Sequence, residues 1–218
     1  MIILSADLAL NHSGIVIFKD KKLLDFYTIT SPKKRKSMSN DVYDLYRLGA
    51  MLKSVDDILK KYKIEYAIIE DYSFGSKSSS LYQIGGFAEG VRLNLFEREI
   101  PIRLVSPKSG KLFATGKGDS DKDRMMKAVR DNWEKIDFLK EIFPRKKKIT
   151  KNDMAQVEDV CDAYALGKLL YTELMLRKGK ILLQDLKEHE IMVFNKVSKK
   201  RPVNILATNF IMKEVDSK

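Results

Sequence analysis

The chain has 218 residues, 44% hydrophobic and 33% charged, so it is long enough to bury one sizeable core and is expected to form one main domain. A net charge of +11 favours a polyanionic partner, with nucleic acid ahead of an anionic membrane surface. The single cysteine, Cys161, excludes an intrachain disulfide and a zinc site made of cysteines. No stretch approaches the roughly 18 apolar residues of a membrane span, so we expect a soluble protein of the cytoplasm.

The first third of the chain predicts three strands, a helix and a fourth strand. Short apolar runs at 2–8, 14–18 and 23–30, separated by turn signals, are typical of a three-stranded meander. Apolar residues recur at three- and four-residue steps from Val42 to Leu59 and predict an amphipathic helix. The apolar run 66–69 ends at Glu70, as expected of a central strand buried on both faces.

The segment 81–95 keeps helical spacing although three glycines interrupt it. Each glycine costs roughly 1 kcal/mol against alanine in a helix interior, so a close approach of another helix is a reasonable offset. The apolar stripe of this helix is core packing by default, and the alternative is part of a two-fold dimer seam. A strand at 100–105, a short helix opened by Ser106 and Pro107, and a helix marked by Met125, Val129 and Trp133 follow.

A long helix is expected from Val157 to Leu176, with Asp153 as its N-terminal cap and Gln156 completing a capping box. The order of strands and helices predicts an α/β fold with a mixed sheet. We place a domain boundary after residue 178. The extension 179–218 has strand character at 191–194 and 203–206, which predicts a hairpin.

Four carboxylates are the strongest functional signal. Asp159 and Asp162 lie on one face of the long helix. Asp7 ends an apolar strand, where burial without a partner would be costly, and Glu70 ends another. If the four converge, they repel one another, and Mg²⁺ or Mn²⁺ is the natural cation between them. Taken alone, Asp159 and Asp162 also fit a solvated acidic helix face.

Such a site suits phosphodiester hydrolysis, in which two metal ions about 4 Å apart orient a water, lower its pKa and stabilise the leaving oxygen. Lys111, Lys117 and Lys122 bracket a glycine-rich turn whose amides are able to meet phosphate. The basic runs 33–36 and 145–148 are phosphate-contacting loops or merely solvated loops. His12 is expected to be a loop residue, and Cys161 a structural one.

Five motifs in order carry a family resemblance. They are the run 4–9 with Gly14, the run 67–70, the segment 85–91, the segment 111–118 with Lys122, and the run 159–163. Their order and spacing resemble the RuvC family of Holliday junction resolvases over roughly residues 1–175. The resemblance implies an RNase H-like fold, with a mixed five-stranded sheet flanked by helices, in a domain spanning residues 1–178. It also implies a homodimer.

The resemblance assigns roles residue by residue. Asp7, Glu70, Asp159 and Asp162 fall on the four carboxylates that bind two Mg²⁺ or Mn²⁺ ions in the family. Lys111 and Lys122 fall on two lysines that contact the scissile region of the DNA. Family members cut four-way DNA junctions, one strand per subunit, and leave 5′-phosphate ends. We therefore expect the four carboxylates and Lys122 to be catalytic.

The sequence departs from the family pattern at several points. Ser73 stands where the family commonly has a phenylalanine that stacks on bases, so either Tyr72 or Phe74 is the expected stacking residue. Asp119 and Asp121 make the turn before Lys122 unusually acidic. The segment 136–150 and the tail after Arg177 have no counterpart in the family. This divergence predicts a phage or mobile-element branch whose substrates include other branched DNA.

Two other functions compete with a junction-cleaving nuclease. One is a non-catalytic branched-DNA-binding protein of the same fold. The other is an ATP-binding protein of the actin and sugar-kinase type, because the opening strand, Asp7 and Gly14 look similar. Proteins of that type need a duplicated domain and a second phosphate loop, for which 218 residues leave little room.

Overall fold

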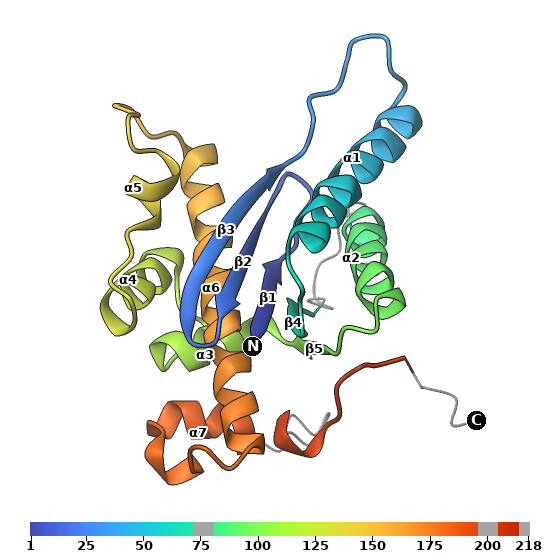
Figure 1. Ribbon diagram of the computed structural model, residues 1–218. Helices are drawn as coiled ribbons and strands as arrows, with labels where there is room; N and C mark the ends of the chain where they lie inside the picture. The colour runs from blue at the N-terminus through green and yellow to red at the C-terminus, as the bar shows by residue number, and fades with distance from the viewer. Residues whose placement is uncertain (72–80, 196–204, 214–218) are drawn as a thin grey trace, which may run out of the picture.

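A computed structural model describes residues 1–71, 81–195 and 205–213. Its centre is one five-stranded sheet in the order β3-β2-β1-β4-β5 (Figure 1). The strands are β1 (Ile2–Asp7), β2 (His12–Lys19), β3 (Lys22–Thr30), β4 (Tyr66–Glu70) and β5 (Ile102–Val105). The first three are antiparallel neighbours, whereas β4 is parallel to both β1 and β5. The predicted meander and mixed sheet are therefore confirmed.

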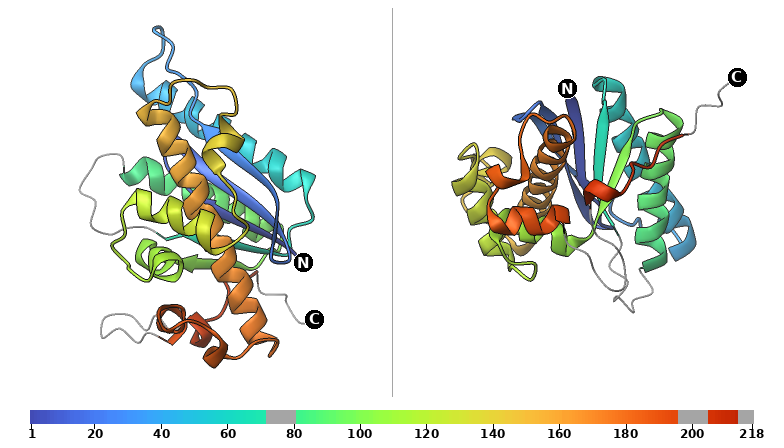
Figure 2. Two further views of the ribbon diagram at one scale, coloured as in Figure 1. Left: turned by 90° about the vertical axis from the view of Figure 1, so that its left-hand side faces the viewer. Right: turned by 90° about the horizontal axis from the view of Figure 1, so that it is seen from below.

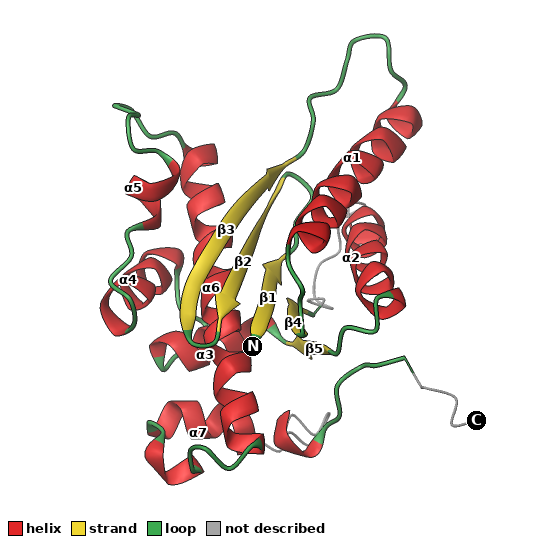
Figure 3. Ribbon diagram, in the orientation of Figure 1, coloured by secondary structure: helices red, strands yellow, loops and turns green. Residues whose placement is uncertain are grey.

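Helices cover both faces of the sheet (Figure 3), which is seen between two helical layers in the right panel of Figure 2. One face packs against α1 (Asn40–Lys61) and α2 (Leu81–Glu97), and the other against α6 (Lys151–Arg177). Around α6 lie α3 (Pro107–Thr115), α4 (Lys122–Asn132), α5 (Phe138–Ile142) and α7 (Glu188–Asn195), with short 3-10 turns at Leu183–Asp185 and Ile205–Ala207. No helix in the described part of the chain is long and apolar enough to cross a bilayer.

The central strands are apolar throughout because each of their faces meets a helical layer. In β1, Ile3 belongs to the core under α6, and its neighbour Leu4 belongs to the core under α1 and α2. Ile68 and Ile69 of β4 divide in the same way. All four side chains are fully buried. This rigid pair of parallel strands positions the two acidic residues that follow at its end.

The glycines of α2 are only partly explained by helix packing. A Cβ at Gly90 would lie 2.8 Å from the Leu52 side chain of α1, so this glycine does permit a close helix approach. At Gly85 and Gly86 a Cβ would meet nothing within 4 Å. Val91 and Leu95 are fully buried in the core of one chain. Core packing is thus confirmed for this part of the stripe, and the dimer-seam alternative is wrong for it.

The predicted apolar stripe of α1 is wrong at its beginning. Val42 and Leu45 are 54% and 71% exposed, whereas Val55 and Leu59 are buried as expected. The first turns of α1 extend past the ends of the strands, where there is no sheet to cover them (Figure 1). Helical periodicity identified the element but not the length of its buried part.

Two further expectations need correction. Residues 191–194 belong to α7 and not to a strand, and Leu206 lies in a 3-10 turn, so there is no hairpin across the described residues of the tail. The cap of α6 is Thr150, not Asp153, and the helix already begins at Lys151. Asp153 is instead the third residue of the helix, and its carboxylate completes the capping box with Thr150.

Candidate active site

Asp7 and Glu70 lie side by side at one end of the sheet. Asp7 ends β1 and Glu70 ends β4, and the two strands are parallel neighbours in which Ala6 pairs with Ile69. The carboxyl ends of parallel strands reach the same edge of a sheet, so both acidic side chains emerge there. The strand pattern in the sequence predicted this pair.

Helix α6 brings the other two carboxylates to the same edge. Asp159 and Asp162 lie about one turn apart on α6, which packs across β1 and β2. Gly14 of β2 pairs with Asp7, and a Cβ at Gly14 would lie only 2.3 Å from the backbone carbonyl of Asp159. The bare glycine therefore lets the helix backbone rest directly on the strand beside Asp7.

The four carboxylates influence one another electrostatically. Burial, followed by the charges of Asp162 and Asp159, raises the pKa of Asp7 well above 3.8. Burial and the charge of Asp7 raise the pKa of Glu70 to about 9. Burial and Asp162 raise the pKa of Asp159 to about 7, and burial raises that of Asp162. The four predicted residues are thus partly buried, and they lie near enough to one another for their charges to interact.

The chemistry of the four carboxylates suits a divalent metal ion. Carboxylate oxygens are the donors that hard divalent cations prefer, and a cation would offset the burial and repulsion that raise these pKa values. No three Asp, Glu, His or Cys side chains of residues 1–71, 81–195 and 205–213 are gathered closely enough to form a ready ligand set. The residue types and their shared edge of the sheet fit the donor preference of a divalent metal.

Two lysines act on the carboxylates. The charges of Lys111 in α3 and Lys122 in α4 oppose the rise in the pKa of Asp7 and of Asp162. Lys122 also forms an ion pair with Glu158, and this hydrogen bond raises the pKa of Lys122. Both lysines therefore lie near enough to the carboxylates to act on them electrostatically.

The turn that precedes α4 is held by its own hydrogen bonds. The hydroxyl of Thr115 accepts from the amide of Lys117 at 3.1 Å, and the hydroxyl of Ser120 donates to the Lys117 carbonyl at 2.9 Å. The Lys117 amide is therefore already engaged, although its side chain is exposed. The carboxylate of Asp121 caps α4 by accepting from the amide of Arg124 at 2.8 Å. One of the two unexpected acids in this turn is thus explained by helix capping.

His12 is the functional neighbour that sequence reasoning missed. It is the first residue of β2, not a loop residue, and its ring nitrogen Nδ1 hydrogen-bonds the carboxylate of Asp159. Burial and the charge of Lys122 lower the pKa of His12. Side chains two apart on a strand share a face, so His12 and Gly14 both face α6. The two-residue spacing of His12 and Gly14 was the sequence signal that could have placed His12 beside the long helix. The other two expected DNA-contacting residues, Tyr72 and Phe74, lie outside the described residues.

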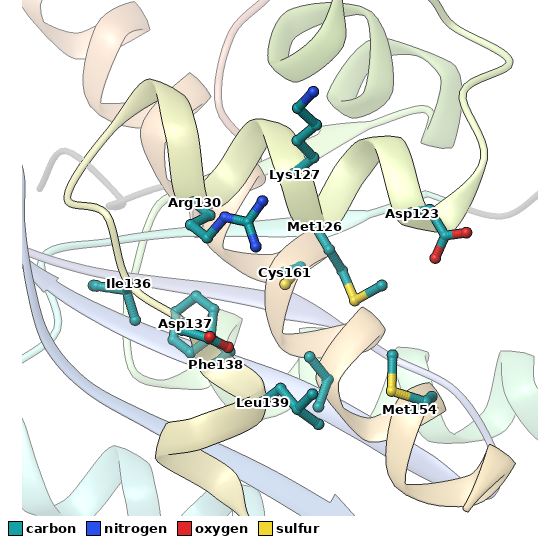
Figure 4. A pocket seen from close by; sticks show the side chains of 11 residues that line it. Asp123, Met126, Lys127, Arg130, Ile136, Asp137, Phe138, Leu139, Met154 and Cys161 are labelled. Carbon is teal, nitrogen blue, oxygen red and sulfur yellow. The ribbon is translucent and has the colours of Figure 1, made fainter. Parts of the chain in front are cut away.

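A well-formed cavity lies away from the carboxylates. It measures about 220 Å³ between α4, α5 and α6, and Figure 4 shows Met126, Met154 and Cys161 among its lining. None of the four carboxylates lines it. Cys161 is 3% exposed, and burial raises the pKa of its thiol, which disfavours the reactive thiolate.

Comparison with known proteins agrees with this fold. The family model described as Crossover junction endodeoxyribonuclease RuvC matches residues 24–137, just over half of the chain. Proteins of that name from Brachyspira hyodysenteriae and Endomicrobium trichonymphae are 28% and 30% identical over 129 and 123 residues. These matches cover 59% and 56% of this chain, and 79% and 56% of the relatives.

Among solved structures, Thermus thermophilus RuvC aligns with a TM-score of 0.54 and 18% identity, covering 82% of this chain and 97% of that one. The same protein in complex with a Holliday junction substrate gives 0.52 and 17%, covering 82% and 96%. At this identity the likeness supports the fold, and the expected RNase H-like architecture is confirmed. The chain belongs to the RuvC family of crossover junction endodeoxyribonucleases.

Proposed function

We propose that this protein is a divalent-metal-dependent endonuclease that cuts four-way DNA junctions, and other branched DNA, inside the cell. Family membership supports junction cleavage. A solved relative is described in complex with a Holliday junction substrate. The net charge of +11 suits a polyanionic substrate.

The observation that carries the proposal is the acidic group at the end of β1 and β4. Partly buried carboxylates that raise one another's pKa are unfavourable for folding, and such groups cluster at functional sites. Here the donor set consists of four oxygen-bearing side chains from three elements, Asp7 of β1, Glu70 of β4, and Asp159 and Asp162 of α6. That set fits Mg²⁺ or Mn²⁺.

In the proposed reaction Asp7, Glu70, Asp159 and Asp162 hold the metal, and Lys122 and Lys111 face the reacting phosphate. When bound, a pair of divalent ions supplies a water of lowered pKa and stabilises the departing oxygen. Lys122 supports the negative charge that develops on the scissile phosphate. His12 restrains the Asp159 carboxylate through its hydrogen bond and so limits the orientations open to it.

A four-way junction has two equivalent strands to cut, and a two-fold symmetric pair of subunits matches this symmetry. We therefore propose a homodimer in which each subunit cuts one strand. The fully buried Val91 and Leu95 of α2 are unavailable to a partner, so the contact must use exposed residues.

Replacing Asp7 by Asn tests the proposal. The variant removes one ligand charge at nearly constant shape, so it should still bind a labelled four-way junction but cut it at least about a thousandfold more slowly, a loss of about 4 kcal/mol in transition-state stabilisation. Mg²⁺ should stabilise the wild-type protein against heating and the variant much less. Asp57→Asn is the matched control, because Asp57 forms an exposed pair with Lys53 on α1. An Asp7→Asn preparation, free of wild type, that cuts normally would refute the proposal.

A substrate comparison separates this function from non-catalytic DNA binding. A labelled four-way junction, a three-way junction and plain duplex are each incubated with the protein, with and without Mg²⁺. Cleavage of the branched DNAs that depends on the metal is expected. Binding without any cleavage would favour the non-catalytic alternative, and equal cutting of all three DNAs would reject structure selectivity.

A further inference from the structure

Two exposed basic loops lie at the carboxylate end of the molecule, and the catalytic reaction uses neither. The first joins β3 to α1 and contains Lys33, Lys34, Arg35 and Lys36. The second joins α5 to α6 and contains Arg145, Lys146, Lys147 and Lys148. All eight side chains belong to exposed residues.

Strand topology places the first loop beside the site. Because β3 is antiparallel to β2, and β2 to β1, β3 runs in the same direction as β1 and ends at the same edge as Asp7. Thr30, the last residue of β3, pairs with His12, which in turn contacts Asp159. The next residue, Ser31, donates its amide to the carbonyl of Asn11 at 2.8 Å. In Figure 1 the loop then arches beyond the strand ends.

The second loop approaches the site along α6. The helix begins at Lys151, and Asp159 follows eight residues later, about 12 Å along the helix axis. The loop therefore lies just ahead of the catalytic carboxylates on the element that carries them. Figure 1 and the left panel of Figure 2 both place the two loops at the same end of the molecule.

Most of these cations have no structural task. Lys34 donates to the side chain of Asn40 at 2.5 Å, and Lys146 pairs with Asp153 at 2.7 Å, so these two residues hold the starts of α1 and α6. The other six form no ion pair with an acid in the described parts of the chain. Arg35 lies over the exposed ring of Tyr46, 5.9 Å from its centre.

The exposed cations of the two loops suit an anionic ligand. The four carboxylates at this end of the molecule disfavour the approach of a phosphate backbone, so DNA that enters the site needs compensating cations on the approach surfaces. We propose that the loops 33–36 and 145–148 bind the backbone phosphates of the DNA arms on either side of the cleavage site. This inference rests on the proposed function, since it takes branched DNA as the ligand. Phosphate contacts fix the position of DNA without reading its sequence, so the loops should act alike on junctions of different sequence.

The test uses two triple variants that spare the structural contacts of Lys34 and Lys146. One is Lys33→Ala with Arg35→Ala and Lys36→Ala, and the other is Arg145→Ala with Lys147→Ala and Lys148→Ala. The matched control is Lys19→Ala with Lys21→Ala and Lys22→Ala, which removes three exposed lysines from the opposite end of β2 and β3. Thermal melting verifies that each variant is folded. Binding to a fluorescent four-way junction is measured without divalent metal, so the DNA stays uncut, over a series of salt concentrations.

Each loop variant should bind about tenfold more weakly near 100 mM salt, and the slope of log affinity against log salt should fall by about 0.9 for each phosphate that the variant no longer neutralises. The control should match the wild type in both. If either loop variant kept the affinity and the salt slope of the wild type, the proposal that both loops bind DNA phosphates would be wrong. An equal loss of affinity in the control variant would also contradict it. A wild-type protein that binds the junction but never cuts it would contradict the catalytic proposal alone, and the loop comparison would still decide this one.

Discussion

Helix α6 carries acids at two places, one fully buried and one partly buried, and the charges that surround them differ. Near its C-terminal end, Glu173 is fully buried and is met by two arginines. Arg103 of β5 contacts its carboxylate at 2.6 and 2.9 Å, and Arg177 contacts it at 2.8 Å. Nearer the N-terminal end, Asp159 and Asp162 interact electrostatically with three further acids, Asp7, Glu70 and Glu158, and with two lysines, Lys111 and Lys122. One acid is neutralised by arginines within the fold, whereas at the other place the acidic side chains outnumber the cations.

The contrast separates a folding role from a functional one. The Arg103 guanidinium also donates to the carbonyls of Thr208 and Asn209 and lies over the ring of Phe210, 4.4 Å from its centre. Next to it, Ile211 bridges to Ile102 at the edge of β5. The ion pair therefore attaches part of the C-terminal extension to the sheet. A charge that is satisfied by the chain stabilises the fold, and a charge that the chain leaves in excess is available to a ligand.

The largest effect is expected from Arg103→Ala. The change leaves Glu173 buried beside one arginine and releases the segment 205–211, so the free energy of unfolding should fall by about 3–5 kcal/mol, as measured by urea denaturation. Replacing Arg103 and Glu173 together by methionine should recover most of that stability. Asp162→Asn is the matched change at the other acidic site, and it should not destabilise the metal-free protein. A large destabilisation there would contradict the contrast.

The second largest loss of stability is expected from Gly14→Ala. The added methyl would lie 2.3 Å from the backbone of Asp159, and backbone cannot move aside as a flexible side chain does. We expect a loss of about 1–3 kcal/mol in stability, together with reduced junction cleavage, because α6 must shift at the carboxylates. At Gly49, in an exposed turn of α1, an added Cβ meets nothing within 4 Å. The control Gly49→Ala should therefore gain about 1 kcal/mol in thermal or urea unfolding. Equal behaviour of the two variants would refute the close approach.

The smallest effect concerns a third acid of α6, Asp153. Hydrogen bonds from Lys146 and Thr150 hold its pKa at about 2, below the ordinary 3.8. Its ionised form therefore stabilises the protein above about pH 4, and this contribution disappears as the pH falls toward 2. Melting curves between pH 2 and 7 should show a smaller loss of stability on acidification for Asp153→Asn than for the wild type. Thr150→Ala should cost about 1 kcal/mol at neutral pH, because it removes the helix cap. If the stability of Asp153→Asn and of the wild type fell equally with pH, Asp153 would not have this role.

Much of the fold was predictable because its signals are local. Period-two and period-3.6 patterns identify the strands and the main helices from nearest neighbours alone. The pattern failed where burial depended on distant elements. It could not show that α1 extends past the sheet and leaves Leu45 exposed, or that residues 191–194 would fold as a helix under α3. The boundary after residue 178 stays a prediction, although part of the extension contacts β5 and α6.

The sequence by itself predicted the mixed sheet from short-range spacing, and it indicated the four carboxylates and the two lysines through residue type and the order of motifs that resembles the family. Only the tertiary structure decided that His12 contacts Asp159, that Gly14 supports the backbone of α6, and that Arg103 meets Glu173. The members of each pair are separated by long stretches of chain. Their meeting depends on strand register and on how α6 crosses the sheet, and no local pattern records either.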